Sequence, residues 1–247
     1  MTGTASPDPR PDATAPAPGA AGDDARALAW DAVVLAGGAA RRLGGERPGD
    51  VKPGLVVGGR ALVDHALAAV AGARRRVLVA PADLARPGVP TTLEDPPLGG
   101  PVAGLAAGLA LLPASTGHPG AAPADELVVV LACDVPRAGE VVDALVAAAS
   151  RPGVDGARLV DDDGVPQHLV AAYRSRALDA ALAALRAGAG VRGASVRRLV
   201  ADLALVGVPD PGGAALDADT WPAVEALTAR LGPGTIDATP DHGGTPS

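Results

Sequence analysis

Residues Val33 to Lys52 read VVLAGGAARRLGGERPGDVK, and this stretch decides how the chain is interpreted. It begins with three aliphatic residues without polar alternation, which is typical of a strand covered on both faces. Gly37 and Gly38 follow, where bare backbone N–H groups can form an anion-binding turn. Arg42 and Lys52 add positive charge beside the turn. The pattern predicts a strand, a glycine turn and a polyphosphate-binding loop.

Lys52 is the only lysine of the chain, while arginine supplies the other twenty of its 21 basic residues. A chain that uses arginine elsewhere and lysine here favours a need for a compact ammonium group at this position. The alternative is an incidental surface lysine near a glycine loop.

Composition limits the function classes. The net charge is −7, which argues against a general nucleic-acid binder, since such a protein is expected to carry a basic face. A single cysteine, Cys133, excludes a disulfide framework and a cysteine-based zinc site. No apolar run reaches membrane-spanning length and no signal peptide is visible. We therefore expect a cytoplasmic protein without nucleic-acid or membrane partners.

The order of predicted elements indicates an α/β fold. Residues 1–28 and 232–247 are rich in Pro, Ala, Gly and Thr and are expected to be disordered tails, which leaves one domain at 29–231. Strands and helices alternate within it, and residues 157–160 and 168–173 flank a predicted hairpin turn. This predicts a single doubly wound, mostly parallel sheet with helices on both faces and a ligand at the carboxyl ends of its strands. Strands are expected at 33–35, 76–80, 91–93, 127–131, 157–160, 168–173 and 203–208, and helices at 61–71, 102–112, 140–150, 175–187 (with Ser175 as its N-cap) and 220–231 (with Thr220 as its N-cap).

Three more segments carry candidate site residues at predicted strand ends. Asp95 opens a loop of small residues through which a base or sugar could approach the backbone, although an ordinary Pro/Gly loop is equally consistent. Asp134 directly follows the most apolar strand, where Mg²⁺ would compensate its desolvation; a helix cap is the alternative. Asp217 and Asp219 either complete a metal site or cap the last helix. The loop at 95–104 also contains Gly100, Pro101 and Gly104.

Other nucleotide motifs are absent from the sequence. A Walker P-loop requires Gly-Lys followed by Ser or Thr, whereas Pro53 follows Lys52, and no G-x-G-x-x-G follows the first strand. His65 is interpreted as structural or solvent-exposed, and His168 as a candidate substrate contact.

The chain resembles the MobA-like nucleotidyltransferases in six motifs, which occur in the same order as in that family. These motifs are LAGG at 35–38, RRLGG at 41–45, Lys52-Pro53, GPVAG at 100–104, CDVP at 133–136 and DADT at 217–220. The similarity covers about residues 31–231 and is greatest to the branch of molybdenum cofactor guanylyltransferases. It implies a nucleotide-diphospho-sugar transferase-like fold and Mg²⁺-dependent transfer of GMP from GTP to molybdopterin, with release of pyrophosphate. It also implies contact with other cofactor-assembly proteins or acceptor molybdoenzymes.

The resemblance assigns roles to individual residues. Leu35, Ala36, Gly37 and Gly38 would wrap GTP, with Gly100, Pro101 and Gly104 lining the nucleotide site. Arg42 and Lys52 would neutralise phosphates, Asp95 would contact the nucleoside, and Asp134 with Asp219 would bind Mg²⁺.

The chain departs from the family pattern at four places. Six residues, 46–51, separate the second glycine pair from Lys52, where the family usually has two. Ala80 stands where the family often has Asn. Val135 replaces a common Thr, and Trp221 replaces the usual Pro. Two alternatives therefore remain open: a related enzyme that uses CTP or another phosphorylated acceptor, and a nucleotide-binding homologue impaired in turnover.

Overall fold

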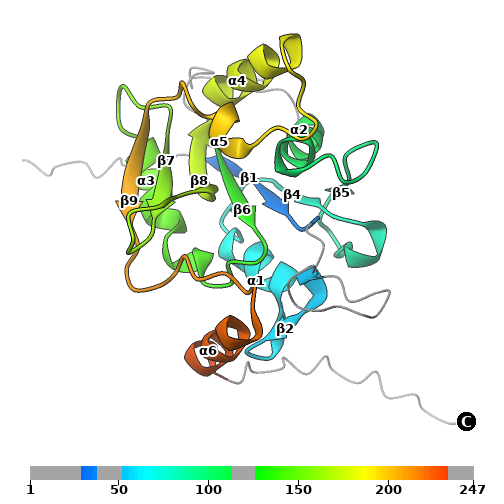
Figure 1. Cartoon of the computed structure of the whole chain (residues 1–247), viewed down its shortest axis with the longest axis vertical. Helices are drawn as coiled ribbons and strands as arrows, with labels where there is room; N and C mark the ends of the chain where they lie inside the picture. The colour runs from blue at the N-terminus through cyan, green and yellow to red at the C-terminus, as the bar shows by residue number, and fades with distance from the viewer. Residues whose placement is uncertain (1–28, 38–51, 113–125, 233–247) are drawn as a thin grey trace, which may run out of the picture.

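The computed structural model describes residues 29–37, 52–112 and 126–232 of the chain (Figure 1). The sheet and helices of this part form an α/β arrangement, with the bounds that follow. The strands are β1 (Trp30–Leu35), β2 (Val56–Val57), β3 (Arg60–Ala61), β4 (Arg76–Val79), β5 (Thr91–Thr92), β6 (Leu127–Ala132), β7 (Gly156–Val160), β8 (Pro166–Arg174) and β9 (Leu205–Pro209). The α-helices are α1 (Leu62–Ala69), α2 (Pro101–Leu111), α3 (Val142–Ala149), α4 (Ser175–Ala187), α5 (Val196–Leu199) and α6 (Trp221–Leu231).

A seven-stranded sheet has the order β5-β4-β1-β6-β8-β7-β9. The pairs β4–β5, β1–β4, β1–β6 and β7–β9 are parallel, and β8 is antiparallel to both of its neighbours. The predicted mostly parallel sheet is confirmed. The predicted hairpin accounts for the reversed strand, because β7 and β8 are joined by the short turn at 161–165.

Helices cover both faces of the sheet because its central strands are apolar on both sides (Figure 1). In β1, Ala32 and Val34 pack with residues of α1 and α3, whereas Val33 packs on the opposite face with α2, α4 and α5. Within α2, Gly108 permits close contact, since a Cβ there would lie 2.7 Å from Val33 Cγ1. The two-sided burial of β1 matches the unalternated aliphatic run in its sequence.

A separate small core joins the C-terminal helix to the short β2–β3 hairpin. Val57 and Leu62 pack against Val224 and Leu227 of α6, and both elements lie together at the lower end of the molecule in Figure 1. This contact holds the segment that precedes α6 close to the segment that begins at Lys52. A hydrogen bond from Ala218 N to Asp134 O at 2.8 Å also holds this segment, and with it Asp219, beside the candidate site.

One predicted helix cap is wrong, and two short elements of the structure were not predicted. Ser175 is not an N-cap: the cap of α4 is Arg174, which makes no side-chain cap hydrogen bond. Thr220 does cap α6, since its Oγ1 accepts a hydrogen bond from Ala223 N at 3.4 Å. The short helix α5 and the β2–β3 hairpin were not predicted, because four- and two-residue elements are too short to show a hydrophobic period.

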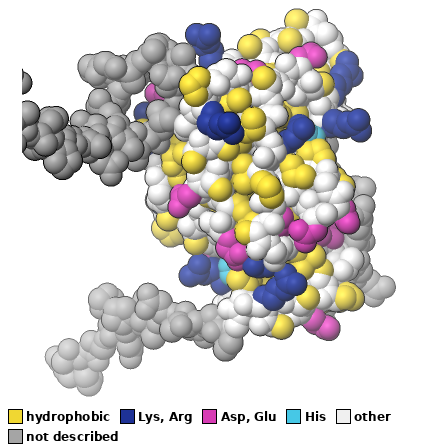
Figure 2. Space-filling view, turned by 90° about the vertical axis from the view of Figure 1, so that its left-hand side faces the viewer, with side chains coloured by type: hydrophobic (Ala, Val, Ile, Leu, Met, Phe, Trp, Pro, Cys, Tyr) yellow, Lys and Arg dark blue, Asp and Glu magenta, His cyan; other side chains and the backbone are white. Residues whose placement is uncertain are grey.

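Surface composition on one side of the molecule is mixed. Figure 2 shows acidic and basic side chains scattered among hydrophobic and other atoms on the face that it presents. Within residues 29–37, 52–112 and 126–232, no helix is long and apolar enough to cross a membrane.

Candidate active site

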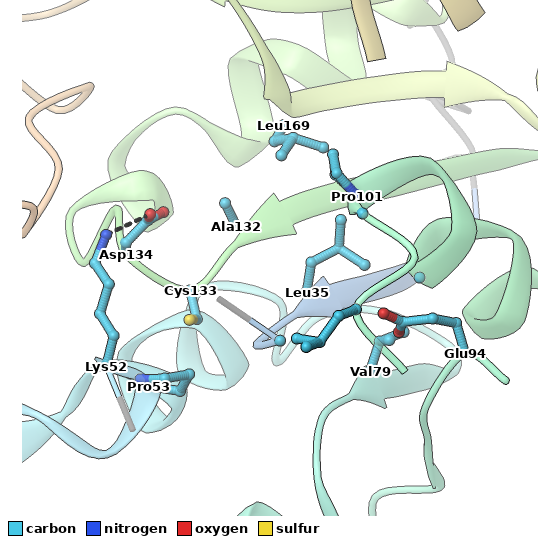
Figure 3. A pocket seen from close by; sticks show the side chains of 14 residues that line it. Leu35, Lys52, Pro53, Val79, Glu94, Pro101, Ala132, Cys133, Asp134 and Leu169 are labelled. Atoms are coloured by element: carbon cyan, nitrogen blue, oxygen red, sulfur yellow. Dashed lines mark hydrogen bonds and ion pairs between the residues drawn. The ribbon is translucent and has the colours of Figure 1, made fainter. Parts of the chain in front are cut away.

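A pocket of about 430 Å³ opens at the carboxyl ends of β1, β4 and β6 (Figure 3). This is the edge at which parallel α/β sheets bind ligands. It is lined by Leu35, Gly37, Lys52, Pro53, Val79, Glu94, Leu98, Gly100, Pro101, Gly104, Ala132, Cys133, Asp134 and Leu169. Seven of the residues proposed from sequence are among them: Leu35, Gly37, Lys52, Gly100, Pro101, Gly104 and Asp134.

The remaining proposed residues lie elsewhere or outside the described part. Ala36 is fully buried beneath the pocket, where its N–H donates to Val79 O at 2.8 Å. Asp95 is exposed and is not one of the pocket-lining residues. Gly38 and Arg42 fall outside the described residues, so their predicted roles stay predictions.

Lys52 is the central charged group of the site. It begins a 3-10 turn, is only 8% exposed, and its Nζ donates to Asp134 Oδ2 at 2.8 Å and to Asp219 Oδ1. Figure 3 shows the Lys52 side chain extending to Asp134 at the pocket rim. Burial alone would lower the pKa of Lys52, but hydrogen bonds and attraction from the two carboxylates outweigh it and raise that pKa. The ammonium is therefore charged.

The acidic side of the site holds more negative charge than one ammonium neutralises. Burial raises the pKa of Asp217, and repulsion from Asp219 and Asp134 raises it further. Mg²⁺ is usually bound by one or two carboxylates together with substrate phosphates, and Asp134 with Asp219 supplies such a donor pair. Among the described residues, no group of three His, Cys, Asp or Glu could hold a metal ion on its own. The donor set thus fits a metal that arrives with a phosphate ligand.

Glu94, which the sequence interpretation passed over, lies on the opposite side of the pocket from Lys52 (Figure 3). One of its carboxylate oxygens accepts from Gly99 N at 3.1 Å. The sequence interpretation predicts the nucleoside contact at its neighbour Asp95, as an acceptor for ribose hydroxyls or base N–H groups. The sequence contained no signal that would have distinguished the two.

The loop that carries Glu94 is held in place by the segment before α5. Arg192 donates to Pro96 O at 2.8 Å and to Pro97 O at 3.3 Å, while Gly193 N donates to Gly99 O at 2.7 Å. Gly100 has φ of 89°, a conformation that L side chains rarely adopt. This glycine therefore turns the backbone into α2 along the pocket wall.

Two nearby groups have structural explanations. Burial, followed by the charge of Asp134, raises the pKa of the Cys133 thiol, so the sulfur is not a nucleophile at neutral pH. His65 Nε2 lies 2.8 Å from Val57 O, in agreement with the structural role predicted for it. The reactive candidates of the described site are thus Lys52 and the carboxylates.

An α/β sheet with a glycine-lined pocket, a buried lysine and paired carboxylates at its carboxyl edge defines a protein of the nucleotide-binding α/β class. The family model described as "MobA-like NTP transferase domain" matches residues 32–207, well over half of the chain. The chain therefore belongs to the MobA-like nucleotidyltransferase family, and the protein is an enzyme of this kind.

Known relatives agree with this assignment. A molybdenum cofactor guanylyltransferase of Acidiphilium cryptum (strain JF-5) is 37% identical over 154 residues, which are 60% of this chain and 69% of that protein. The crystal structure of Mycobacterium tuberculosis Rv0371c matches with a TM-score of 0.58 and 23% identity, covering 82% of this chain and 99% of that one. The 2-C-methyl-D-erythritol 4-phosphate cytidylyltransferase of Thermus thermophilus matches with a TM-score of 0.56 and 18% identity, covering 81% of this chain and 98% of that one. These two structures show the fold.

Proposed function

We propose that this enzyme transfers GMP from GTP to the terminal phosphate of molybdopterin, in a Mg²⁺-dependent reaction that releases pyrophosphate. The observation that carries the proposal is that Lys52 and Asp134 line a pocket with several glycines, and that the same lysine contacts both Asp134 and Asp219. The name of the Acidiphilium relative supports the choice of guanylyl transfer.

The pocket suits a purine nucleoside on its side away from Lys52. Leu35, Val79 and Pro101 offer apolar surface for a flat ring. Guanine presents two adjacent N–H donors, and the carboxylate of Glu94 is an acceptor in the same wall. The proposal thus gives Glu94 the base contact that the sequence had suggested for Asp95.

The phosphates would then extend toward Lys52. Among the described residues, no atom beyond the chain neighbours lies within 4 Å of where a Cβ of Gly37 would be, so this part of the chain leaves room at the carboxyl end of β1. Lys52 would contribute its positive charge to phosphate oxygens that gain charge as the reaction proceeds. Asp134 and Asp219 would hold Mg²⁺, which supplies charge neutralisation for the triphosphate.

The reaction joins one phosphate oxygen of the acceptor to the α-phosphorus of GTP and breaks the bond between that phosphorus and the bridging oxygen to the β-phosphate. The electron pair of the broken bond leaves on pyrophosphate. The protein is required chiefly to position the two phosphates and to neutralise their charge. From the family resemblance we further propose a cytoplasmic reaction and contact with cofactor-assembly proteins or acceptor molybdoenzymes.

The test is pyrophosphate release by the purified full chain with molybdopterin, Mg²⁺ and either GTP or CTP. We expect release with GTP far in excess of release with CTP, and none without molybdopterin. Preference for CTP would point to cytidylyl transfer instead. Tight GTP binding without pyrophosphate release would identify a nucleotide-binding homologue that has lost turnover.

A further inference from the structure

An irregularity in the sheet lies beside the pocket, in the hairpin of β7 and β8. Arg158 is opposite Ala171, but the next residue of β7, Leu159, is already opposite Gln167. Residues 168–170 of β8 are therefore extra residues, which have no paired residue on β7 between Arg158 and Leu159. Bulges of this kind re-aim side chains and are enriched next to active sites.

Two buried nitrogen atoms at this bulge have no hydrogen-bond partner among the described residues: Arg158 Nε and His168 Nδ1. Buried polar atoms are nearly always paired in native structures, so an unpaired pair of nitrogens indicates a site that receives a ligand or water. The backbone here is firmly held, because the buried Tyr173 donates its hydroxyl hydrogen to His168 O at 2.7 Å. The two nitrogens thus lie on a fixed part of the sheet.

Arg197 of α5 adds a third basic group. The neighbouring Val196 packs in one core cluster with Ala171 and Tyr173 of β8, so α5 lies against this strand. Burial lowers the pKa of His168, and the positive charges of Arg158 and Arg197 lower it further. Neither arginine takes part in an ion pair within the described residues. The cluster is therefore basic, and no ion pair within the described residues neutralises its two arginines.

The cluster adjoins the nucleotide pocket. His168 directly precedes Leu169, which lines the pocket. Because β8 is antiparallel to β6, with Val170 opposite Leu131, the first residues of β8 lie at the same sheet edge as the end of β6. Asp134 follows that end of β6, so the cluster and the pocket lie at the same edge of the sheet.

We propose that Arg158, His168 and Arg197 form a second anion subsite that binds the phosphate monoester of the acceptor. The assignment of its ligand rests on the proposed guanylyl transfer, which needs two phosphate compounds held side by side. The guanidinium groups would donate to the non-attacking oxygens of the phosphate, as arginine does in paired anion contacts. The remaining oxygen would then be free to approach the α-phosphorus of the nucleotide.

The probe is inorganic phosphate, added to the full chain with isotope-labelled histidines. The chain has four histidines, and His168→Gln identifies the signal of interest by its loss. We expect phosphate to shift the imidazole signals of His168 saturably and to raise its pKa, because the anion offsets the two arginines. Arg158→Gln should weaken phosphate binding at this signal by about tenfold or more.

Two further variants make the test specific. Arg197→Gln alters an exposed side chain, so it avoids the folding risk of the half-buried Arg158, and it should also weaken phosphate binding. Arg198→Gln, one residue further along α5, should leave binding unchanged. In the coupled reaction, Arg197→Gln should raise the KM for molybdopterin and leave the KM for GTP unchanged.

The outcomes separate this subsite from the proposed reaction. A His168 signal that ignores phosphate, or one that responds equally in Arg158→Gln and Arg197→Gln, overturns the subsite even if GTP-dependent pyrophosphate release is intact. A phosphate response that is lost in both variants supports the subsite. If the wild-type chain then failed to bind GTP, that failure would count against guanylyl transfer and not against the subsite.

Discussion

Lys52 Nζ donates to Asp134 Oδ2 at 2.8 Å across 82 residues of sequence, and the same ammonium contacts Asp219. The lysine thus lies between the two carboxylates that are proposed to bind Mg²⁺. Because the ammonium already occupies Asp134 Oδ2 and Asp219 Oδ1, we expect a divalent cation at this carboxylate pair to compete with Lys52. The triphosphate of the nucleotide would provide the ammonium with an alternative anionic partner.

The first prediction concerns Lys52→Met, which keeps most of the aliphatic chain and removes the charge. In the nucleotide-free protein, Mn²⁺ should bind about tenfold more tightly than in the wild type, because its competitor is gone. Pyrophosphate release should instead slow by about a hundredfold or more, as expected when a charge contact to the reacting phosphates is lost. Electron paramagnetic resonance of free Mn²⁺ measures the first quantity.

Arg86→Met is the matched control. Arg86 Nε forms an ion pair with Asp64 Oδ1 at 2.7 Å, and neither residue lines the pocket. It should leave both quantities unchanged. If Lys52→Met bound Mn²⁺ no better than the wild type, the competition between ammonium and metal would be wrong.

The second prediction compares two aspartates that are two residues apart. Asp219→Asn should lower the free energy of unfolding without metal by about 1 kcal/mol, because Lys52 loses a charged partner in a partly exposed position. Asp217→Asn should instead raise the free energy of unfolding at neutral pH. The raised pKa of Asp217 means that its negative charge is disfavoured in the folded state. Urea unfolding of both variants measures the difference.

The pH dependence of the Asp217 effect follows from the same direction of shift. The gain in Asp217→Asn should be present at neutral pH and disappear below the unfolded pKa of about 3.9, where the carboxyl is protonated in both states. A stability loss in Asp217→Asn at pH 7 would contradict the repulsion inferred among Asp217, Asp219 and Asp134.

The third prediction tests Glu94 as the base contact. Glu94→Gln keeps the size of the side chain and one acceptor oxygen, but it removes the negative charge. GTP binding should weaken by about 1.5 to 3 kcal/mol, the range for hydrogen bonds to charged groups. Isothermal calorimetry with GTP and ATP measures the effect, and the loss should be much smaller for ATP, whose base lacks the two adjacent N–H donors.

Asp95→Asn is the control for this substitution. Asp95 is exposed and absent from the pocket lining, so GTP affinity should stay within error of the wild type. A larger loss in Asp95→Asn than in Glu94→Gln would restore the original sequence-based assignment.

Much of this site could be anticipated from local sequence, but not its pairings. The aliphatic run of β1 and the residues Lys52 and Asp134 were recognisable because glycine turns and strand-end carboxylates have short-range signals. The contact of Lys52 with Asp219 spans 167 residues and depends on the packing of α6 against β2, which no local pattern reports.

The position of Glu94 was inaccessible for a similar reason. Adjacent carboxylates cannot be ranked by spacing, and the orientation of their loop is fixed by Arg192, 96 residues beyond Pro96. Likewise, the bulge at His168 arises from the pairing of β7 with β8 and has no sequence signature of its own.

The fourth prediction concerns Asp31, at the edge of the sheet opposite the pocket. Asp31 is 3% exposed and accepts hydrogen bonds from Arg74 Nη2 at 2.9 Å and from Arg75 Nε at 3.0 Å. Burial alone would raise the pKa of Asp31, but the two arginines outweigh it and hold that pKa below its usual range. Asp31→Asn should therefore lower the free energy of unfolding at pH 7 by about 2 to 3 kcal/mol.

The pH profile distinguishes this charge effect from a simple packing defect. Because the pKa of Asp31 is lower in the folded state, its contribution is complete above the unfolded pKa of about 3.9 and is lost as the pH falls through the folded value. The stability difference between the wild type and Asp31→Asn should thus begin to shrink near pH 4 and disappear only below the folded pKa of Asp31. A stability difference that stayed constant across this acid range would mean that shape, rather than ionisation, explains why this carboxylate is buried between two arginines.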